Sequence, residues 1–390
     1  MEALRFTGSG SEYFKIWIVN VLLTILTLGL YYPWAKVRNR RYFYANSTLS
    51  DRNFEYHATG KQLFLGFLIA MVFFILYNIL GQINPFLGLA ALLVLFIAIP
   101  WLIWRSLMFN MRVSSFSNVH FAFVGKLGTA YINFFVYPFL LILAFYAGPI
   151  IAAVAMPRLM YNENMSWIGS LIPIFMIASM VIAFYLFAVI KKRNTEFVIN
   201  GTRYGQGIFE AKLKAKKFMM INLKGIGVML AIVIPLIAVG SVLGVGEFMT
   251  PFTNPESMQR GELPDGFGMF FALIYFVLII VSILVMSYVH TRQRTYIYEN
   301  TKLDDKIAFA STLKAKSFAW IMLSNFFLVI ITFGLAFPWA KVRMARLMLE
   351  NTLVETEEGF DEYISQKQAE VSSLGEQIGD AFDVDIDVAF

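Results

Sequence analysis

Long apolar segments dominate this chain and limit the folds open to it. A helix needs about 20 mostly apolar residues to cross the hydrocarbon core of a membrane. The segments that reach or approach this length are 16–34, 63–82, 86–108, 129–155, 167–190, 225–246, 267–289 and 318–339. Only 15% of the 390 residues are charged, whereas soluble domains carry about 25%. The sequence therefore predicts an all-α polytopic membrane protein with eight hydrophobic helical segments.

Positive charge is concentrated in the long connections between these segments. The six central segments form the helix pairs 63–108, 129–190 and 225–289, and the joins within the pairs carry only two basic residues. The four longer connections, counted with Arg105 at the end of segment 86–108, carry 24 basic residues in all. Loops rich in Lys and Arg stay in the cytoplasm. We therefore predict a multi-pass protein whose long basic connections are cytoplasmic.

The long connections resemble one another, which indicates an internal repeat. Residues 200–216 align with 300–316 without a gap, and 40–49 share a pattern with 294–303. Turns are expected at Ser50-Asp51, Ser117-Asn118, Gly205-Gln206-Gly207 and Asp304-Asp305. Short runs of alternating polar and apolar residues flank these turns, which predicts cytoplasmic β-hairpin modules that could join into one sheet. Amphipathic linkers lying on the lipid surface are the alternative.

The two outer segments share a motif that joins an apolar stretch to a basic one. It reads Thr-x-Gly-x-x-x-Pro-Trp-Ala-Lys-Val-Arg and occupies residues 27–38 and 332–343. Its repeated members are Gly29, Pro33, Trp34, Lys36 and Arg38 in the first copy and Gly334, Pro338, Trp339, Lys341 and Arg343 in the second. Because Gly and Pro both interrupt helices, each copy is predicted to be a break point.

Hairpin-like sequence flanks both sides of each outer segment. If every such module is cytoplasmic, segments 16–34 and 318–339 must leave and re-enter the membrane on one side. We therefore predict two re-entrant or interfacial helices and cytoplasmic termini. The length of the two segments supports the alternative, in which all eight segments span the membrane and both termini lie outside.

Polar residues within the segments are few, and no Asp or Glu lies in any of them. The candidates for intramembrane polar contacts are Asn20, Asn78, Asn133, Asn222 and Asn325. Each can form an interhelical hydrogen bond or contact a solute. The chain has no cysteine, and its three histidines show no metal-ligand spacing. We therefore predict no catalytic, metal or cofactor site and no enzyme activity.

Charge also separates the body of the chain from its end. Residues 355–390 hold eleven acidic residues and one basic residue, Lys367. The body, 1–354, is predicted to be one repeated membrane domain that meets anionic headgroups at the cytoplasmic face of the bilayer, in preference to nucleic acid. The tail is predicted to be partly disordered and solvated; folding back onto the basic modules is the alternative.

The run Gly-Leu-Tyr-Tyr-Pro-Trp-Ala-Lys-Val-Arg at 29–38, followed by Arg-Tyr-Phe-Tyr at 41–44, resembles the YjgN family of bacterial inner-membrane proteins. The likeness extends over residues 5–354, although Ala336 stands where the first copy of the motif has Tyr31. This resemblance implies a polytopic protein of the bacterial inner (plasma) membrane with a domain of unknown function. It brings no catalytic or binding residues.

Two functions from different classes remain open. The first is a transporter or channel-like protein for an unidentified solute, in which Pro-kinked helices surround a polar path. The second is a membrane-organising or interaction protein whose basic modules bind anionic lipid or a protein partner. A polar cavity across the central helices favours the first function, and a dry, closed bundle favours the second.

Overall fold

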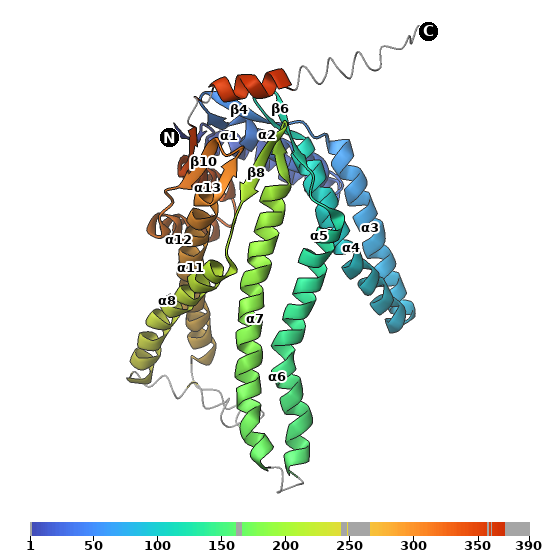
Figure 1. Cartoon of the computed structure of the whole chain (residues 1–390), viewed down its shortest axis with the longest axis vertical. Helices are drawn as coiled ribbons and strands as arrows, with labels where there is room; N and C mark the ends of the chain where they lie inside the picture. Colours follow the sequence, from blue (N-terminus) through green and yellow to red (C-terminus); the bar gives the residue numbers. More distant parts are fainter. Residues whose placement is uncertain are drawn as a thin grey trace. The chain divides into compact units, whose positions relative to one another are not determined.

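The computed structural model describes residues 2–160, 166–242, 248, 266–356, 359 and 361–370. The chain divides into two compact units. The first comprises residues 1–218, 297–312 and 338–390, and the second comprises 219–296 and 313–337. Helices make up most of both units, and the first unit also contains a β-sheet (Figure 1).

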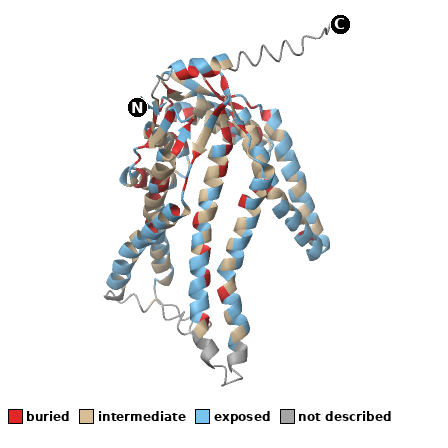
Figure 2. Ribbon diagram, in the orientation of Figure 1, coloured by how far each residue is buried: buried red, intermediate tan, exposed pale blue. Residues whose placement is uncertain are grey.

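Long apolar helices account for most of the described residues. Six of the described helices are long and apolar enough to cross a membrane, and they coincide with the six predicted central segments. They are α3 (Gly60–Ile83), α4 (Pro85–Arg112), α6 (Tyr137–Met160), α7 (Ser166–Gly201), α8 (Ala215–Val242) and α11 (Phe267–Glu299). Helix α6 continues from α5 (Leu127–Tyr131) through a π-helical turn, η1 (Ile132–Val136). Many of their apolar side chains are exposed (Figure 2), as expected of helices that face lipid.

Each of the two outer segments contains a turn. Segment 16–34 falls on α1 (Gly10–Leu26), a turn and α2 (Tyr32–Ala45), and segment 318–339 falls on α12 (Ala315–Ile331), a turn and α13 (Phe337–Glu350). Among the described residues, the eight predicted helical segments therefore reduce to six long helices and two pairs of shorter ones. The reason is local, because apolar sequence runs through a Gly-centred turn that a count of apolar residues does not detect.

Helices α1 and α2 of the first unit run antiparallel. Near the start of α1, the ring of Tyr13 stacks on that of Tyr42, with 5.3 Å between the ring centroids. Further along, Asn20 Nδ2 donates to Asn39 Oδ1 at 3.0 Å. Helix α2 therefore returns the chain to the level at which α1 began.

Short strands between the helix pairs form hairpins, as predicted for the modules, and assemble into one antiparallel sheet. The strands are β1 (Glu2–Ala3), β2 (Arg5–Phe6), β3 (Ser47–Leu49), β4 (Arg52–Tyr56), β5 (Ser114–Phe116), β6 (Val119–Phe123), β7 (Thr202–Tyr204), β8 (Gly207–Ala211), β9 (Thr301–Leu303), β10 (Ile307–Ser311) and β11 (Thr352–Thr356). The described residues form an eleven-stranded sheet in the order β1-β11-β10-β9-β8-β7-β6-β5-β4-β3-β2. A single short hairpin is marginal in water, so the strands gain stability by pairing with those of neighbouring repeats.

The strand order returns to the N-terminus at both of its ends. β1 and β2 occupy opposite ends of the order, yet only Leu4 separates them in the chain. β1 pairs with β11, and β2 pairs with β3. Leu4 N also donates to the carbonyl of Thr352 at 3.1 Å. The first residues of the chain therefore join its first and last repeats.

The tight turns join the strands at one end, and the helical connections join them at the other end. We call these two ends the tight-turn edge and the helix edge of the sheet. From β2 to β11, strands that are neighbours in the sheet are also consecutive in the sequence and antiparallel, so successive connections alternate between the two edges. Turns occupy the expected places, and Ser50-Asp51, Ser117-Asn118 and Asp304-Asp305 all have positive φ. Two consecutive positive φ angles are the type I′ geometry that matches strand twist. Each helical connection in the described chain therefore begins and ends at the other edge.

Candidate functional site: an apolar chamber inside the sheet

A partly open cavity with a volume of about 360 Å³ is lined mainly by strands of the first unit, and we call it the chamber. Two sets of equivalent strand positions line it. The third residues of β3, β5, β7 and β9 are Leu49, Phe116, Tyr204 and Leu303, and the central residues of β4, β6, β8 and β10 are Phe54, Phe121, Phe209 and Phe309. Because side chains alternate between the faces of a strand, each repeat places these two positions on the inner face.

The wall of the chamber offers little free polarity. None of the described residues that line it is charged. The hydroxyls of Thr202, Thr301 and Thr352 each donate to the carbonyl four residues earlier, at 2.7, 2.7 and 2.9 Å. The hydroxyl of Tyr204 donates to the carbonyl of Phe116 at 3.0 Å. Burial raises the pKa of Tyr204, so this hydroxyl stays protonated. The wall therefore suits an apolar occupant.

A helix formed by residues 361–370 lies against the tight-turn edge of the sheet (Figure 1), and we call it the cover helix. Its Tyr363 and Ile364 are buried and line the chamber. Its polar side chains reach three of the turn regions: Asp361 pairs with Arg52 at 2.9 Å, Lys367 pairs with Asp304 at 2.9 Å, and Gln368 donates to the carbonyl of Ser117 at 2.6 Å. For this stretch the tail folds back, which was the alternative to a solvated tail; residues 371–390 lie outside the described chain.

Asp304 is the centre of the contacts that hold the cover helix. Its carboxylate accepts hydrogen bonds from the backbone N–H of Ile208 at 2.7 Å and from the hydroxyl of Tyr363 at 2.9 Å, besides its pair with Lys367. Burial alone acts to raise the pKa of Asp304, but these donors outweigh it and hold the pKa below its usual value. Burial acts to lower the pKa of Lys367, but Asp304 and Glu370 outweigh it and raise that pKa. Both partners are therefore charged at neutral pH.

The repeated motif of the outer segments forms the same turn in both copies. Gly29 has φ +92° after Leu28 at +50°, and Gly334 has φ +90° after Phe333 at +49°. Thr27 Oγ1 accepts from Tyr31 N at 2.9 Å, and Thr332 Oγ1 accepts from Ala336 N at 3.0 Å. Pro33 and Pro338 follow in the first turns of α2 and α13, where a missing N–H costs nothing. Both predicted break points are therefore turns between two helices.

The tryptophan of each motif packs against the first residue of another helix. A Cβ at Gly60 of α3 would lie 2.2 Å from Trp34 Cδ1, and a Cβ at Gly10 of α1 would lie 2.2 Å from Trp339 Cδ1. Trp34 also lies 5.1 Å from the ring of Phe64, and Trp339 lies 5.1 Å from the ring of Phe14. Trp34 therefore contacts α3, which begins the next helix pair in the sequence, and Trp339 contacts α1, the first helix of the chain.

The basic residues of the motif lie on α2 and α13. A guanidinium N–H of Arg38 donates to the hydroxyl of Tyr31 at 3.2 Å, and Lys341 Nζ donates to the hydroxyl of Tyr13 at 3.2 Å. Lys36 is exposed, and Arg343 is partly exposed. The structure does not bring these residues together into a binding site for a solute.

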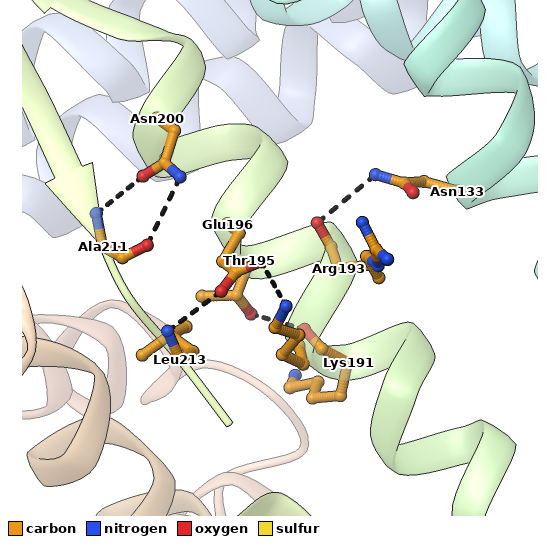
Figure 3. A network of polar contacts seen from close by, with 9 residues as sticks. Asn133, Lys191, Arg193, Thr195, Glu196, Asn200, Ala211 and Leu213 are labelled. Carbon is orange, nitrogen blue, oxygen red and sulfur yellow. Dashed lines mark hydrogen bonds and ion pairs between the residues drawn. The ribbon is translucent and has the colours of Figure 1, made fainter. Parts of the chain in front are cut away.

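Three of the five candidate asparagines connect two helices. Asn20 is buried and donates to Asn39, and in the second unit Asn222 accepts a hydrogen bond from Gln293 at 2.9 Å. Asn133 lies in η1, is buried, and donates to the carbonyl of Arg193 at 3.3 Å (Figure 3). Asn78 is exposed and donates to Phe74 of its own helix, and Asn325 is partly buried on α12. These contacts support the interhelical role.

A polar network that sequence reasoning missed fastens the end of α7 to the strand β8 (Figure 3). Asn200 accepts from Ala211 N at 2.6 Å and donates to the carbonyl of the same residue at 3.3 Å. Glu196 accepts from Leu213 N at 2.9 Å and pairs with Lys192 at 2.8 Å. The alignment of Asn200 with Asn300 in the repeat could have indicated a structural role for Asn200. Its partner, Ala211, follows only from the pairing of the strands in the sheet.

The long apolar helices, with their exposed apolar side chains, define a polytopic integral membrane protein. Residues 1–381 match the family described as "Bacterial protein of unknown function (DUF898)", and the chain belongs to that family.

Curated relatives extend the match to named proteins. The "Inner membrane protein YjgN" of Salmonella typhimurium is 30% identical over 368 residues, which cover 91% of this chain and 88% of the relative. Two Escherichia coli proteins of the same name are 27% identical, over 89% of this chain and 87% of their own length. No solved structure matches the chain. These likenesses confirm the resemblance found in the sequence and establish a multi-pass inner membrane protein of unknown function.

Proposed function

We propose that this protein is a transporter or channel-like protein for an unidentified solute, with the chamber as the binding station outside the bilayer. The supporting observation is that inward side chains from every repeat line one shared cavity. A core whose only role is stability is packed with few voids larger than a water molecule. A volume of about 360 Å³ instead falls in the range of small-molecule sites, about 300–1,000 Å³.

The sheet lies on the cytoplasmic side of the inner membrane in this proposal. Its connections carry most of the positive charge of the chain. Both outer segments are then re-entrant or interfacial, since β2 and β3 flank the first of them within one sheet, and β10 and β11 flank the second. Both termini are cytoplasmic for the same reason.

Transport is tested by filling the chamber. Leu303→Trp puts a larger side chain into the cavity, whereas the control Lys302→Trp alters the adjacent, exposed position of β9. Vesicles containing the purified protein are loaded with a panel of radiolabelled solutes ranging from sugars to fatty acids. At least one solute is expected to exit more than tenfold faster than from vesicles without protein. Leu303→Trp is expected to remove this gain in rate, and Lys302→Trp is expected to keep it. If no solute of the panel exits faster with protein than without it, the proposal is wrong.

A second candidate function is organisation of anionic lipid. An arginine stands eleven residues before the same inward strand position in each repeat: Arg38, Arg105, Arg193, Arg292 and Arg343. Each basic side chain near an anionic surface contributes about 1 kcal/mol to membrane attraction. Replacing the five by Gln is expected to reduce the anionic lipid that copurifies with the protein more than twofold. An unchanged lipid content contradicts this function.

A further inference from the structure

We propose that the chamber binds the hydrocarbon chain of an anionic single-chain amphiphile, such as a fatty acid, and that the cover helix must move aside to admit it. This inference deepens the proposed transport function because it names the class of solute. Binding in the chamber and transport across the membrane are measured in separate experiments, so the binding proposal and the transport proposal can be contradicted independently.

The first observation is the chemistry of the wall. Phe54, Phe121, Phe209 and Phe309 recur around the chamber. The hydroxyls of Thr202, Thr301 and Tyr204 beside them already donate to carbonyls. A cavity that offers water few partners stays dry and favours apolar ligands. Sugars, nucleotides and inorganic ions would lose their hydration here without replacement.

The second observation is where the chamber lies along the chain. Val198 and Ile199 are in the last turn of α7, and Ile297 and Tyr298 are in the last turn of α11, and all four line the chamber. Residues 171–201 and 267–299 are each long and apolar enough to span a membrane. The chamber therefore adjoins the ends of spanning helices, where lipid-like molecules are concentrated.

The third observation is that the cover helix presents the chemistry of such a ligand. Ile364 has no exposed surface and reaches into the chamber, and Tyr363 is 2% exposed. Asp361, three residues before Ile364, places a carboxylate 2.9 Å from the guanidinium of Arg52. Ile364 thus puts an apolar group into the chamber while Asp361 puts a carboxylate on Arg52. A fatty acid would reproduce this arrangement with its hydrocarbon chain and its carboxylate. The cover helix and the ligand therefore compete for the same positions.

The test uses the full chain in lipid nanodiscs and a photoactivatable fatty acid, with the labelled peptides mapped by mass spectrometry. Labelling is expected in β8 and β10, and Ile364→Asp, which disfavours the seated cover helix, is expected to raise it about tenfold by population shift. The matched control is Gln366→Asp, since Gln366 is exposed on the same helix. Leu303→Trp is expected to abolish the strand labelling.

Arg52→Ala supplies a measurement that does not depend on filling the chamber. It is expected to lower the ratio of labelling by the fatty acid to labelling by the matching neutral fatty alcohol at least fivefold. Only the carboxylate uses the guanidinium, whereas losing the pair with Asp361 loosens the cover helix for both ligands alike. Labelling confined to the spanning helices, or equal effects of Arg52→Ala on acid and alcohol, would overturn the proposal. If labelling behaves as expected while no solute crosses the vesicle membrane, the chamber binds amphiphiles and transport is wrong.

Discussion

At the residue scale, the structure depends on a few positions where a small side chain or a buried charge has one specific partner. Gly60 lies under the indole of Trp34, and Asp304 collects three donors at the turn edge of the sheet. The sequence showed Trp34 as a repeated residue but not what it contacts, since Gly60 lies 26 positions further along the chain. Asp304 was predicted only as a turn residue, because its partners lie far away in the chain: Ile208 on β8, and Tyr363 and Lys367 in the tail.

Gly60→Ala is expected to destabilise the first unit. The new Cβ would lie 2.2 Å from Trp34 Cδ1, so the indole must shift. Overpacking of this kind costs about 1–3 kcal/mol, measured as a lower thermal midpoint in nanodiscs. Gly66→Ala in the same helix is the control, because nothing lies within 4 Å of its Cβ. Equal midpoints for the two variants contradict the packing described here.

The contact between Asp304 and Lys367 predicts how attachment of the cover helix depends on pH. The pKa of Asp304 is depressed, so its contribution is present above about pH 3.9, the unfolded value, and is lost as the pH falls through the lower folded pKa. The pKa of Lys367 is raised, so its contribution is present below about pH 10.4 and is lost as the pH rises further. Tyr363 and Glu370 are the other titratable groups at this contact.

A spin label at Ser365→Cys measures this dependence, because Ser365 is exposed on the cover helix. The label is expected to be slow between these limits and to gain mobility beyond either one. With Asp304→Asn added, the gain in mobility at low pH is expected to disappear. The label is also expected to be more mobile at neutral pH, since a hydrogen bond to a charged group is worth about 1.5–3 kcal/mol. Mobility that does not change from pH 3 to pH 11 contradicts the assignment.

At the element scale, the sequence predicted the helices and turns that depend on local patterns of residues. The six spans follow from the length of apolar sequence, and the tight turns follow from Asn, Asp and Gly at the centre of alternating runs. Segment 16–34 was counted as one apolar segment, but Gly29 and Pro33 of its motif predicted the break that the structure places between Leu26 and Tyr32. A helix over 355–368 was compatible with the sequence of the tail, but only Tyr363 and Ile364 mark the apolar face that packs on the sheet, so its docking was not predicted.

Gly334→Ala tests the turn between α12 and α13. A residue with a Cβ pays about 1–2 kcal/mol in the left-handed conformation that Gly334 adopts at φ +90°, so the thermal midpoint is expected to fall. Gly227→Ala, within α8, meets nothing within 4 Å and keeps ordinary helical backbone. It is expected to leave the midpoint unchanged or to raise it. A drop for Gly227→Ala alone contradicts the turn geometry.

At the scale of the whole molecule, the repeat explains the architecture. Each repeat supplies a helix pair and strands to a common sheet, and the N-terminal strand joins the last repeat to the first. Individual hairpins were predictable from the sequence, but the number of strands and their order were not. Strand pairing between β4 and β5 or between β6 and β7 links residues far apart in the chain, and no local pattern encodes that choice.

We propose that the sheet lies on the cytoplasmic side of the membrane, and that each helix pair starts and ends at one side of this sheet. Single cysteines test it directly, because the chain has none of its own. Arg5→Cys, Gln206→Cys and Ser365→Cys report on the sheet and the cover helix, and Gln82→Cys reports on the far end of α3. A membrane-impermeant maleimide added to intact spheroplasts is expected to label only Gln82→Cys, and the other three react once the membrane is permeabilised. Labelling of Arg5→Cys or Ser365→Cys in intact spheroplasts would contradict the account.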